Sequence, residues 1–261
     1  MFCLLKISER RDNLKEKIFG KFIRDTYELK TIPVFKGAPF YKLEVTIGKR
    51  GIDWQQVTYF IGKCANRLLL DESINIDDIT DVGRYKNKIL YEKMMKNTFV
   101  EVLKQQNKIF DSLCIIDKRG ASTDFLLDLV PFFEKITITT DQKPKYEKIC
   151  DYILENTGLC VLLQSEIENS TVKIDTERNI MTINTENGLY NISDGENFRV
   201  PEIYENLYDN SVDKLLFYSA LYEFCGVFEL ADSCFETILI NGEKKGINEL
   251  IFTWHNHNFL I

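Results

Sequence analysis

The sequence lacks the motifs that identify several well-known classes of enzyme and metal-binding domain. Its 261 residues include only two histidines, and none of its seven cysteines forms a Cys-x-x-Cys pair, so no zinc-ribbon motif is present. Motifs of the types G-x-S-x-G, G-x-x-x-x-G-K-[ST] and H-E-x-x-H are also missing. These absences exclude the usual signatures of α/β-hydrolases, P-loop nucleotidases and zinc proteases.

Long apolar segments are missing as well. No window of about 18 uncharged residues occurs, so the sequence predicts no membrane-spanning helix. The apolar run at residues 1–6 is too short for a signal peptide. The cysteines are odd in number and scattered, mostly within apolar stretches, which is typical of reduced and buried thiols. We therefore expect a cytoplasmic protein that makes no contact with a membrane.

The composition that remains is that of a folded globular protein, with 44% hydrophobic, 12% aromatic and 28% charged residues. The net charge of −7 is unevenly distributed: residues 1–105 hold 20 Lys and Arg against 14 Asp and Glu, and residues 106–261 hold 13 against 26. Length and asymmetry together predict two α/β domains, a net basic one at 1–105 and a net acidic one at 106–261. The first could attract an anion, and the second should repel nucleic acid; alternatively, the halves attract each other.

Hydrophobic periodicity predicts alternating strands and helices in the N-terminal half. Pro33, Gly37 and Pro39 are expected to interrupt the chain between elements. Asp53 should cap a helix whose apolar residues include Trp54, Val57, Ile61, Cys64 and Leu68, and residues 104–108 should form a linker. The expected elements are a strand at 2–7, a helix from Ser8 to about Arg24, a strand at 42–47, the helix after Asp53 and a helix from Tyr85 to Gln105 with Ile89, Leu90, Met94, Phe99, Val102 and Leu103 buried.

The second half opens with a β-α-β-α-β pattern. Apolar strands at 112–116, 135–140 and 159–164 alternate with amphipathic helices at 123–133 and from about Tyr146 to Gly158, so the strands should run parallel. Short strands at 171–175, 180–184 and 189–192 are then expected to form antiparallel hairpins. A helix at 212–225, with Leu215, Leu216 and Tyr222 inward, should precede strands at 237–240 and 250–254. The predicted fold class is α/β, with a Rossmann-like parallel sheet plus antiparallel hairpins in the second domain.

The turn after the first of these strands is the main candidate for a ligand site. Residues 111–165 resemble the nucleotide-binding half of Rossmann-like proteins, in which a glycine-rich turn and a helix N-terminus hold a phosphate. The resemblance implies an anion near Arg119, Gly120, Ser122 and Thr123, with Asp141 at a ribose hydroxyl. The glycine pattern departs from G-x-G-x-x-G, because Lys118 and Thr123 stand where its outer glycines belong. Gly120 could equally serve a tight turn, with Ser122 or Thr123 as a helix cap.

A second basic turn extends this candidate site. Lys49-Arg50-Gly51 repeats the tripeptide 118–120, and each copy stands between a predicted strand and a predicted helix. If both turns open on one cleft, Arg50 and Arg119 could bind two anionic groups of one ligand; otherwise they are solvated surface cations.

The remaining candidates for chemistry are weaker. His255 and His257 could share a strand face, but no third ligand is evident, so no metal is predicted. Cys234 could be a reactive thiol only if a histidine lay beside it in the fold. The acidic stretches at 71–81 and 194–209 lack the spacing of a calcium loop.

Two segments carry a resemblance to other proteins. The runs Asp53-Trp54-Gln-Gln-Val57 and Ala220-Leu-Tyr-Glu-Phe-Cys225 resemble conserved α/β proteins of anaerobic bacteria, a group with no characterised chemistry. The resemblance implies a degenerate Rossmann-like unit. Two functions follow as hypotheses: a non-enzymatic cytoplasmic binding or interaction protein, with a protein partner or a second copy of itself, or an enzyme acting on a nucleotide or other phosphate-bearing small molecule in an interdomain cleft. No cofactor is assigned, although the turn could hold a nucleotide or dinucleotide.

Overall fold

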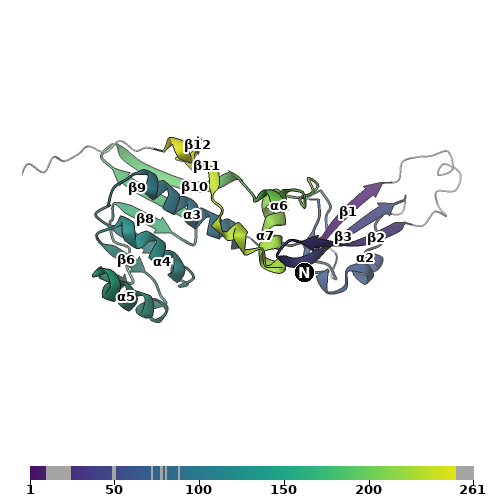
Figure 1. Cartoon of the computed structure of the whole chain (residues 1–261), viewed down its shortest axis with the longest axis horizontal. Coiled ribbons are helices and arrows are strands. Elements are labelled where there is room, and N and C mark those ends of the chain that lie inside the picture. The colour runs from purple at the N-terminus through teal and green to yellow at the C-terminus, as the bar shows by residue number, and fades with distance from the viewer. Residues whose placement is uncertain are drawn as a thin grey trace, which may run out of the picture. The chain divides into compact units, whose positions relative to one another are not determined.

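The fold was analysed in a computed structural model that describes residues 1–9, 25–48, 51–71, 73–76, 79, 81–87 and 89–250 (Figure 1). The chain forms two compact units: unit 1 comprises Met1–Tyr91 and Val200–Asp232, and unit 2 comprises Glu92–Arg199 and Ser233–Ile261. Each unit is discontinuous in sequence, whereas the predicted domains 1–105 and 106–261 are continuous. The α/β fold class is confirmed, because the helices accompany two β-sheets.

Unit 1 contains a four-stranded sheet in the order β2-β3-β1-β4 (Figure 1). Strands β2 and β3 form an antiparallel hairpin, and β1 runs parallel to both β3 and β4. The strands are β1 (Cys3–Glu9), β2 (Thr26–Val34), β3 (Gly37–Ile47) and β4 (Leu68–Leu69).

The prolines at the β2–β3 hairpin do not break the chain, contrary to the expectation from sequence. Pro33 lies in β2, which is an edge strand, and the register shifts between Ile32 and Val34. Pro39 lies in β3 before the part of that strand that pairs with β1, which begins at Tyr41. Edge positions and irregular registers tolerate a residue without an N–H donor. The hairpin turns through Lys36, whose φ is 53°.

Helix α2 (Trp54–Ile61) begins as predicted, because the Asp53 carboxylate accepts hydrogen bonds from the N–H groups of Gln55 and Gln56. It ends earlier than predicted, at Gly62, whose φ of 51° terminates the α-helix. A short 3₁₀ turn (Gly62–Cys64) follows. Cys64 and Leu68 nevertheless join Val57 in the core that packs on β1 and β3.

The segment 200–232 completes unit 1 with helices α6 (Glu202–Glu205) and α7 (Lys214–Cys225) and a 3₁₀ helix (Phe228–Asp232). The prediction of the inward-facing residues of α7 was wrong, since Leu215, Leu216 and Tyr222 are only partly buried. Its buried side chains are instead Phe217, Tyr218, Ser219, Ala220, Leu221 and Cys225. The physical reason is aromatic packing: the Phe217 ring meets the rings of Phe2, just before β1, and Phe40, on β3, edge-on, with ring centroids 6.1 and 5.8 Å apart.

Helix α3 (Ile89–Gln105) starts later than the predicted Tyr85. Residues 84 and 85 are extended, because Arg84 forms an isolated parallel β-bridge with Leu68 and the Tyr85 N–H donates a hydrogen bond to the Leu68 carbonyl. Ile89 is therefore 37% exposed, and the other five residues of the predicted apolar stripe are buried.

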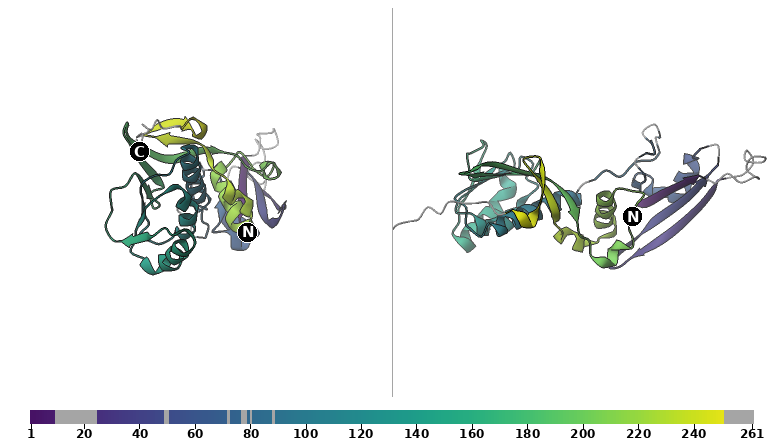
Figure 2. Two further views of the ribbon diagram at one scale, coloured as in Figure 1. Left: turned by 60° about the vertical axis from the view of Figure 1, so that its left-hand side comes forward. Right: turned by 90° about the horizontal axis from the view of Figure 1, so that it is seen from above.

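Unit 2 is built on an eight-stranded sheet in the order β12-β11-β10-β9-β8-β5-β6-β7. Helices α3 and α4 (Thr123–Leu129) lie side by side, with the Lys96 ammonium 5.8 Å from the Phe125 ring (Figures 1 and 2). The strands are β5 (Leu113–Ile116), β6 (Ile136–Thr139), β7 (Val161–Gln164), β8 (Val172–Asp175), β9 (Ile180–Thr185), β10 (Gly188–Phe198), β11 (Phe235–Ile240) and β12 (Glu243–Gly246).

The predicted parallel β-α-β-α-β unit is confirmed. Strand β6 pairs in parallel with both β5 and β7, and α4 and α5 (Lys143–Thr157) connect them. Gly158, with φ 76°, caps α5 as expected. Helix α4 ends before the predicted Phe133, because Pro131 starts a 3₁₀ turn (Val130–Phe132).

Strand β8 joins the two halves of the sheet. It pairs in parallel with β5 on one side and antiparallel with β9 on the other. The antiparallel β8–β9 and β9–β10 pairs confirm the predicted hairpins. The first helix was expected to begin at Ser8, but Ser8 and Glu9 belong to β1, where they pair with Thr46 and Ile47. The rest of that predicted helix and most of the predicted strand at 250–254 lie outside the described residues.

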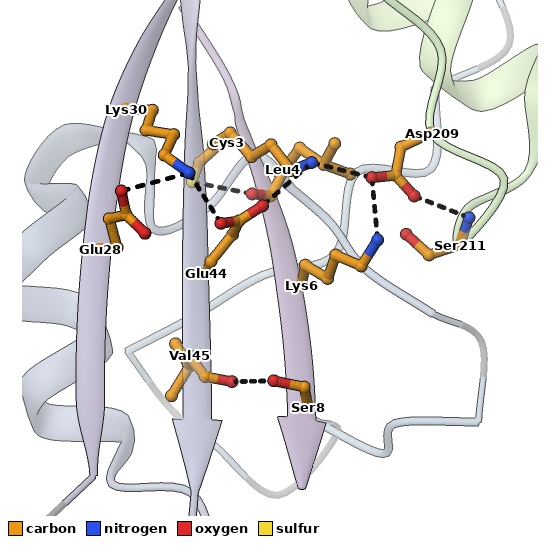
Figure 3. Close-up of polar contacts among 11 residues, drawn as sticks. Cys3, Leu4, Lys6, Ser8, Glu28, Lys30, Glu44, Val45, Asp209 and Ser211 are labelled. Atoms are coloured by element: carbon orange, nitrogen blue, oxygen red, sulfur yellow. Dashed lines mark hydrogen bonds and ion pairs between the residues drawn. The ribbon is translucent and has the colours of Figure 1, made fainter. Parts of the chain in front are cut away.

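A chain of ion pairs crosses the unit 1 sheet and reaches the segment 200–232 (Figure 3). Lys42 on β3 contacts Glu44 at 3.2 Å and Asp209 at 3.0 Å, and Lys6 on β1 contacts the same Asp209 oxygen at 3.3 Å. Burial alone would raise the pKa of Asp209, but hydrogen bonds from Lys42 and Ser211 hold the pKa well below its usual range.

Asp209→Asn should lower the free energy of unfolding by about 1.5–3 kcal/mol at neutral pH, because hydrogen bonds to a charged group are lost. Since folding lowers the Asp209 pKa, its contribution is present above the unfolded pKa of about 4 and declines as the pH falls below it. Urea unfolding between about pH 3 and 7 should therefore show a weaker acid dependence in the variant. Glu28→Gln, at a 65% exposed side chain beside Lys30, is the control and should change little. Equal effects of the two substitutions would contradict the assignment.

Candidate functional site

The candidate site lies at the carboxyl end of β5, where the chain turns into α4. Asp117 follows the strand directly and continues its pairing, because its N–H donates to the Thr139 carbonyl at 3.0 Å. The residue is only 1% exposed. A buried carboxylate needs hydrogen-bond donors to offset the loss of water, so its partners define the site.

The Asp117 carboxylate accepts three hydrogen bonds. The N–H of Ala121 donates to Oδ1 at 3.2 Å, and the N–H of Ser122 donates to Oδ2 at 2.8 Å. The Tyr146 hydroxyl, from α5, donates to Oδ2 at 2.6 Å. Burial and the neighbouring carboxylate raise the pKa of Tyr146, so the phenol stays protonated and acts as a donor.

The remaining turn residues are also engaged by the protein itself. The Gly120 N–H donates to the Asp117 carbonyl at 3.3 Å, and the Lys145 ammonium donates to the Arg119 carbonyl at 2.8 Å. Gly120 has φ 62°, and a Cβ there would come within 2.8 Å of the Lys145 side chain. A glycine is thus required both by the backbone conformation and by the close approach of α5.

The predicted ligand-binding residues are only partly brought together. Arg119 points into solvent, with 84% of its side chain exposed and its Nε 3.8 Å from a Glu177 carboxylate oxygen. Ser122 occupies the N-cap position of α4 but makes no side-chain cap hydrogen bond, and Thr123 is the first residue of the helix. The N–H groups of Ala121 and Ser122 are therefore bound by the Asp117 carboxylate rather than by the Ser122 hydroxyl.

Asp141 is exposed in the next strand-to-helix turn. It does not cap α5; the N-cap position belongs to Gln142, whose N–H donates to the buried Thr140 hydroxyl at 3.0 Å. The two turns do meet, since Gln142 would lie 3.0 Å from a Cβ at Gly120.

The second basic turn cannot be described in full, because Lys49 and Arg50 lie outside the described residues. Its glycine, Gly51, has φ 81°, and the helix after it is capped by Asp53. Each of these two turn glycines, with positive φ, is thus followed or preceded by an aspartate that accepts hydrogen bonds from backbone N–H groups, in the first turn of α2 for Asp53 and just before α4 for Asp117.

Two residues of the site were missed from the sequence. Asp117 was not singled out, although Asp side chains commonly accept hydrogen bonds from nearby backbone N–H groups in turns. Tyr146 was assigned only to the buried stripe of its helix, and nothing in the sequence connects its hydroxyl to a residue 29 positions away.

The other candidates for chemistry have unremarkable surroundings. All seven cysteines are free, and Cys3, Cys64, Cys114 and Cys225 are buried, which confirms the expectation of reduced and mostly buried thiols. Burial raises the pKa of Cys234, which disfavours the nucleophilic thiolate. The described residues contain no group of three His, Cys, Asp or Glu suited to a metal ion, and His255 and His257 lie outside them.

The comparisons with known proteins returned nothing similar. The chain matches no protein-family model, no curated protein and no solved structure. Within the described part of the chain, no helix has the length and apolar character needed to cross a membrane.

Tyr146→Phe should lower the free energy of unfolding by about 1.5–3 kcal/mol, because a buried carboxylate loses one of its donors. Tyr152→Phe on the same helix, at a 54% exposed ring, is the matched control and should stay within about 0.5 kcal/mol of the wild type. Denaturant unfolding of the three proteins measures both values. A Tyr146→Phe protein as stable as the wild type would show that the Tyr146–Asp117 contact contributes nothing.

Proposed function

We propose that this chain is a non-enzymatic binding or interaction protein of the bacterial cytoplasm, with a degenerate Rossmann-like domain that serves as a scaffold. One observation carries the proposal: the Asp117 carboxylate accepts hydrogen bonds from the N–H groups of the turn. In nucleotide-binding proteins of this topology, a phosphate accepts hydrogen bonds from the corresponding groups. The protein has, in effect, its own anion at that position.

The energetics favour the internal carboxylate over an external phosphate. A ligand would have to displace Asp117 from the N–H groups of Ala121 and Ser122, which leaves a buried negative charge with fewer donors beside its own. Arg119 adds little attraction for such a ligand, since its exposed guanidinium is solvated and lies near Glu177. The free cysteines fit the proposed reducing compartment.

Calorimetric titration of the full chain with inorganic phosphate, ATP and NAD tests this proposal. We expect no saturable heat and no thermal shift at millimolar ligand, because the donors are occupied. A saturable signal that Arg119→Ala weakens by about 1.5–3 kcal/mol would overturn the proposal in favour of the alternative, an enzyme acting on a phosphate-bearing small molecule.

The stability of Arg119→Ala provides the control for that titration. Its side chain is 84% exposed and makes only a long contact with Glu177. We therefore expect its free energy of unfolding to stay within about 0.5 kcal/mol of the wild type, so that any change in ligand binding is not a folding defect.

A further inference from the structure

The edges of the two sheets differ in how well they are protected against pairing with another strand. Strand β12, at one edge of the unit 2 sheet, has the sequence Glu-Lys-Lys-Gly, and its lysines form ion pairs with Glu196 and Glu243. Strand β2, at an edge of the unit 1 sheet, carries Glu28, Lys30 and Pro33. Charged side chains and proline are the usual protection of exposed sheet edges.

Strand β7, at the other edge of the unit 2 sheet, has no such protection. Among the described residues β7 pairs with β6 alone, so its outer side presents backbone donors and acceptors without a neighbouring strand. Its sequence is Val-Leu-Leu-Gln. The whole stretch from Leu159 to Ser165 contains no charged residue and no proline.

Apolar side chains are exposed on both faces of this edge. Leu162 is 43% exposed, and the β6–β7 register places it on the face opposite to Val161. On the Val161 face, helix α5 presents Leu154, which is 48% exposed.

The orientation of α5 places Leu154 toward the outer side of β7. Lys145 lies on the flank of the helix that reaches inward to the Arg119 carbonyl. Cys150 lies on the opposite flank. The pKa of Cys150 is raised by burial, by the Asp151 charge and by the nearby Cys160, which lies just before β7. Leu154 follows Cys150 by four residues and so shares its side of the helix.

We infer that β7 is the dimerisation edge of the protein and pairs antiparallel with β7 of a second copy of this chain. Antiparallel self-pairing about a twofold axis sets only uncharged side chains of residues 159–165 opposite one another. The Glu168 carboxylate on the Leu162 face is bound by Lys135 and by Thr137, the β6 residue that pairs with Leu162. The arrangement continues the sheet across two chains, with a Leu162 cluster on one face and the two Leu154 side chains on the other.

This inference deepens the proposed function by naming the partner, and it rests on that proposal's premise that the protein acts by association. Its failure is distinguishable from a failure of the proposal, because the dimer is measured by mass and the ligand site by calorimetry.

Sedimentation of the full chain over about 1–100 μM should show a transition to twice the chain mass. Leu162→Lys should weaken self-association about tenfold or more, since it sets lysines near each other across the twofold axis. Leu189→Lys is the matched control: Leu189 is a 54% exposed leucine of β10 in the same sheet, and the variant should dimerise like the wild type.

A charge-pair rescue guards against a folding defect. Leu162→Lys and Leu162→Glu should each self-associate more weakly than the wild type, and their mixture should recover two-chain species through opposite charges. Hydrogen exchange at residues 161–164 should slow as wild-type dimer forms. A wild type that stays at one chain mass throughout, or variants at Leu162 that dimerise as the wild type does, would overturn the inference.

Discussion

The buried carboxylate of Asp117 is the constraint on which the architecture of the βαβ region depends. It binds the two residues that lead into α4, Ala121 and Ser122, through their N–H groups, and it holds α5 through the Tyr146 hydroxyl. Because a charge at this depth is tolerated only with such partners, the strand end, both helices and the turn glycine are fixed together. In the proposed function, these contacts take the place of an anion at the turn.

Local patterns predicted the parallel region well. Apolar strands alternating with amphipathic helices gave the correct order β5-α4-β6-α5-β7, and Gly158 marked the end of α5, because these features depend on short-range periodicity and backbone conformation. The Asn241–Gly242 turn that leads into β12 is another local signal, because both residues have positive φ. The packing of the helical segment 200–232 against the N-terminal sheet depends on contacts between residues far apart in the sequence, which hydrophobic periodicity cannot reveal.

The candidate site was predicted in outline and not in its chemistry. The sequence identified the turn at Gly120 and the start of α4 near Ser122, since a glycine and a capping residue have local signatures. It did not identify the acceptor, because the Asp117 carboxylate is held in place by a tyrosine from another helix, 29 positions away in the sequence. The unprotected edge at β7 likewise became visible only once the strand order was known.

The central claim is that the N–H groups of Ala121 and Ser122 are bound to Asp117 and closed to external anions. The most direct measurement is a ¹H–¹⁵N NMR titration of the full chain with phosphate and ATP, following these two amide signals. The account predicts that neither signal moves with ligand, and that Asp117→Asn shifts both because the charged acceptor is lost. Saturable movement of both signals with phosphate in the wild type would contradict it.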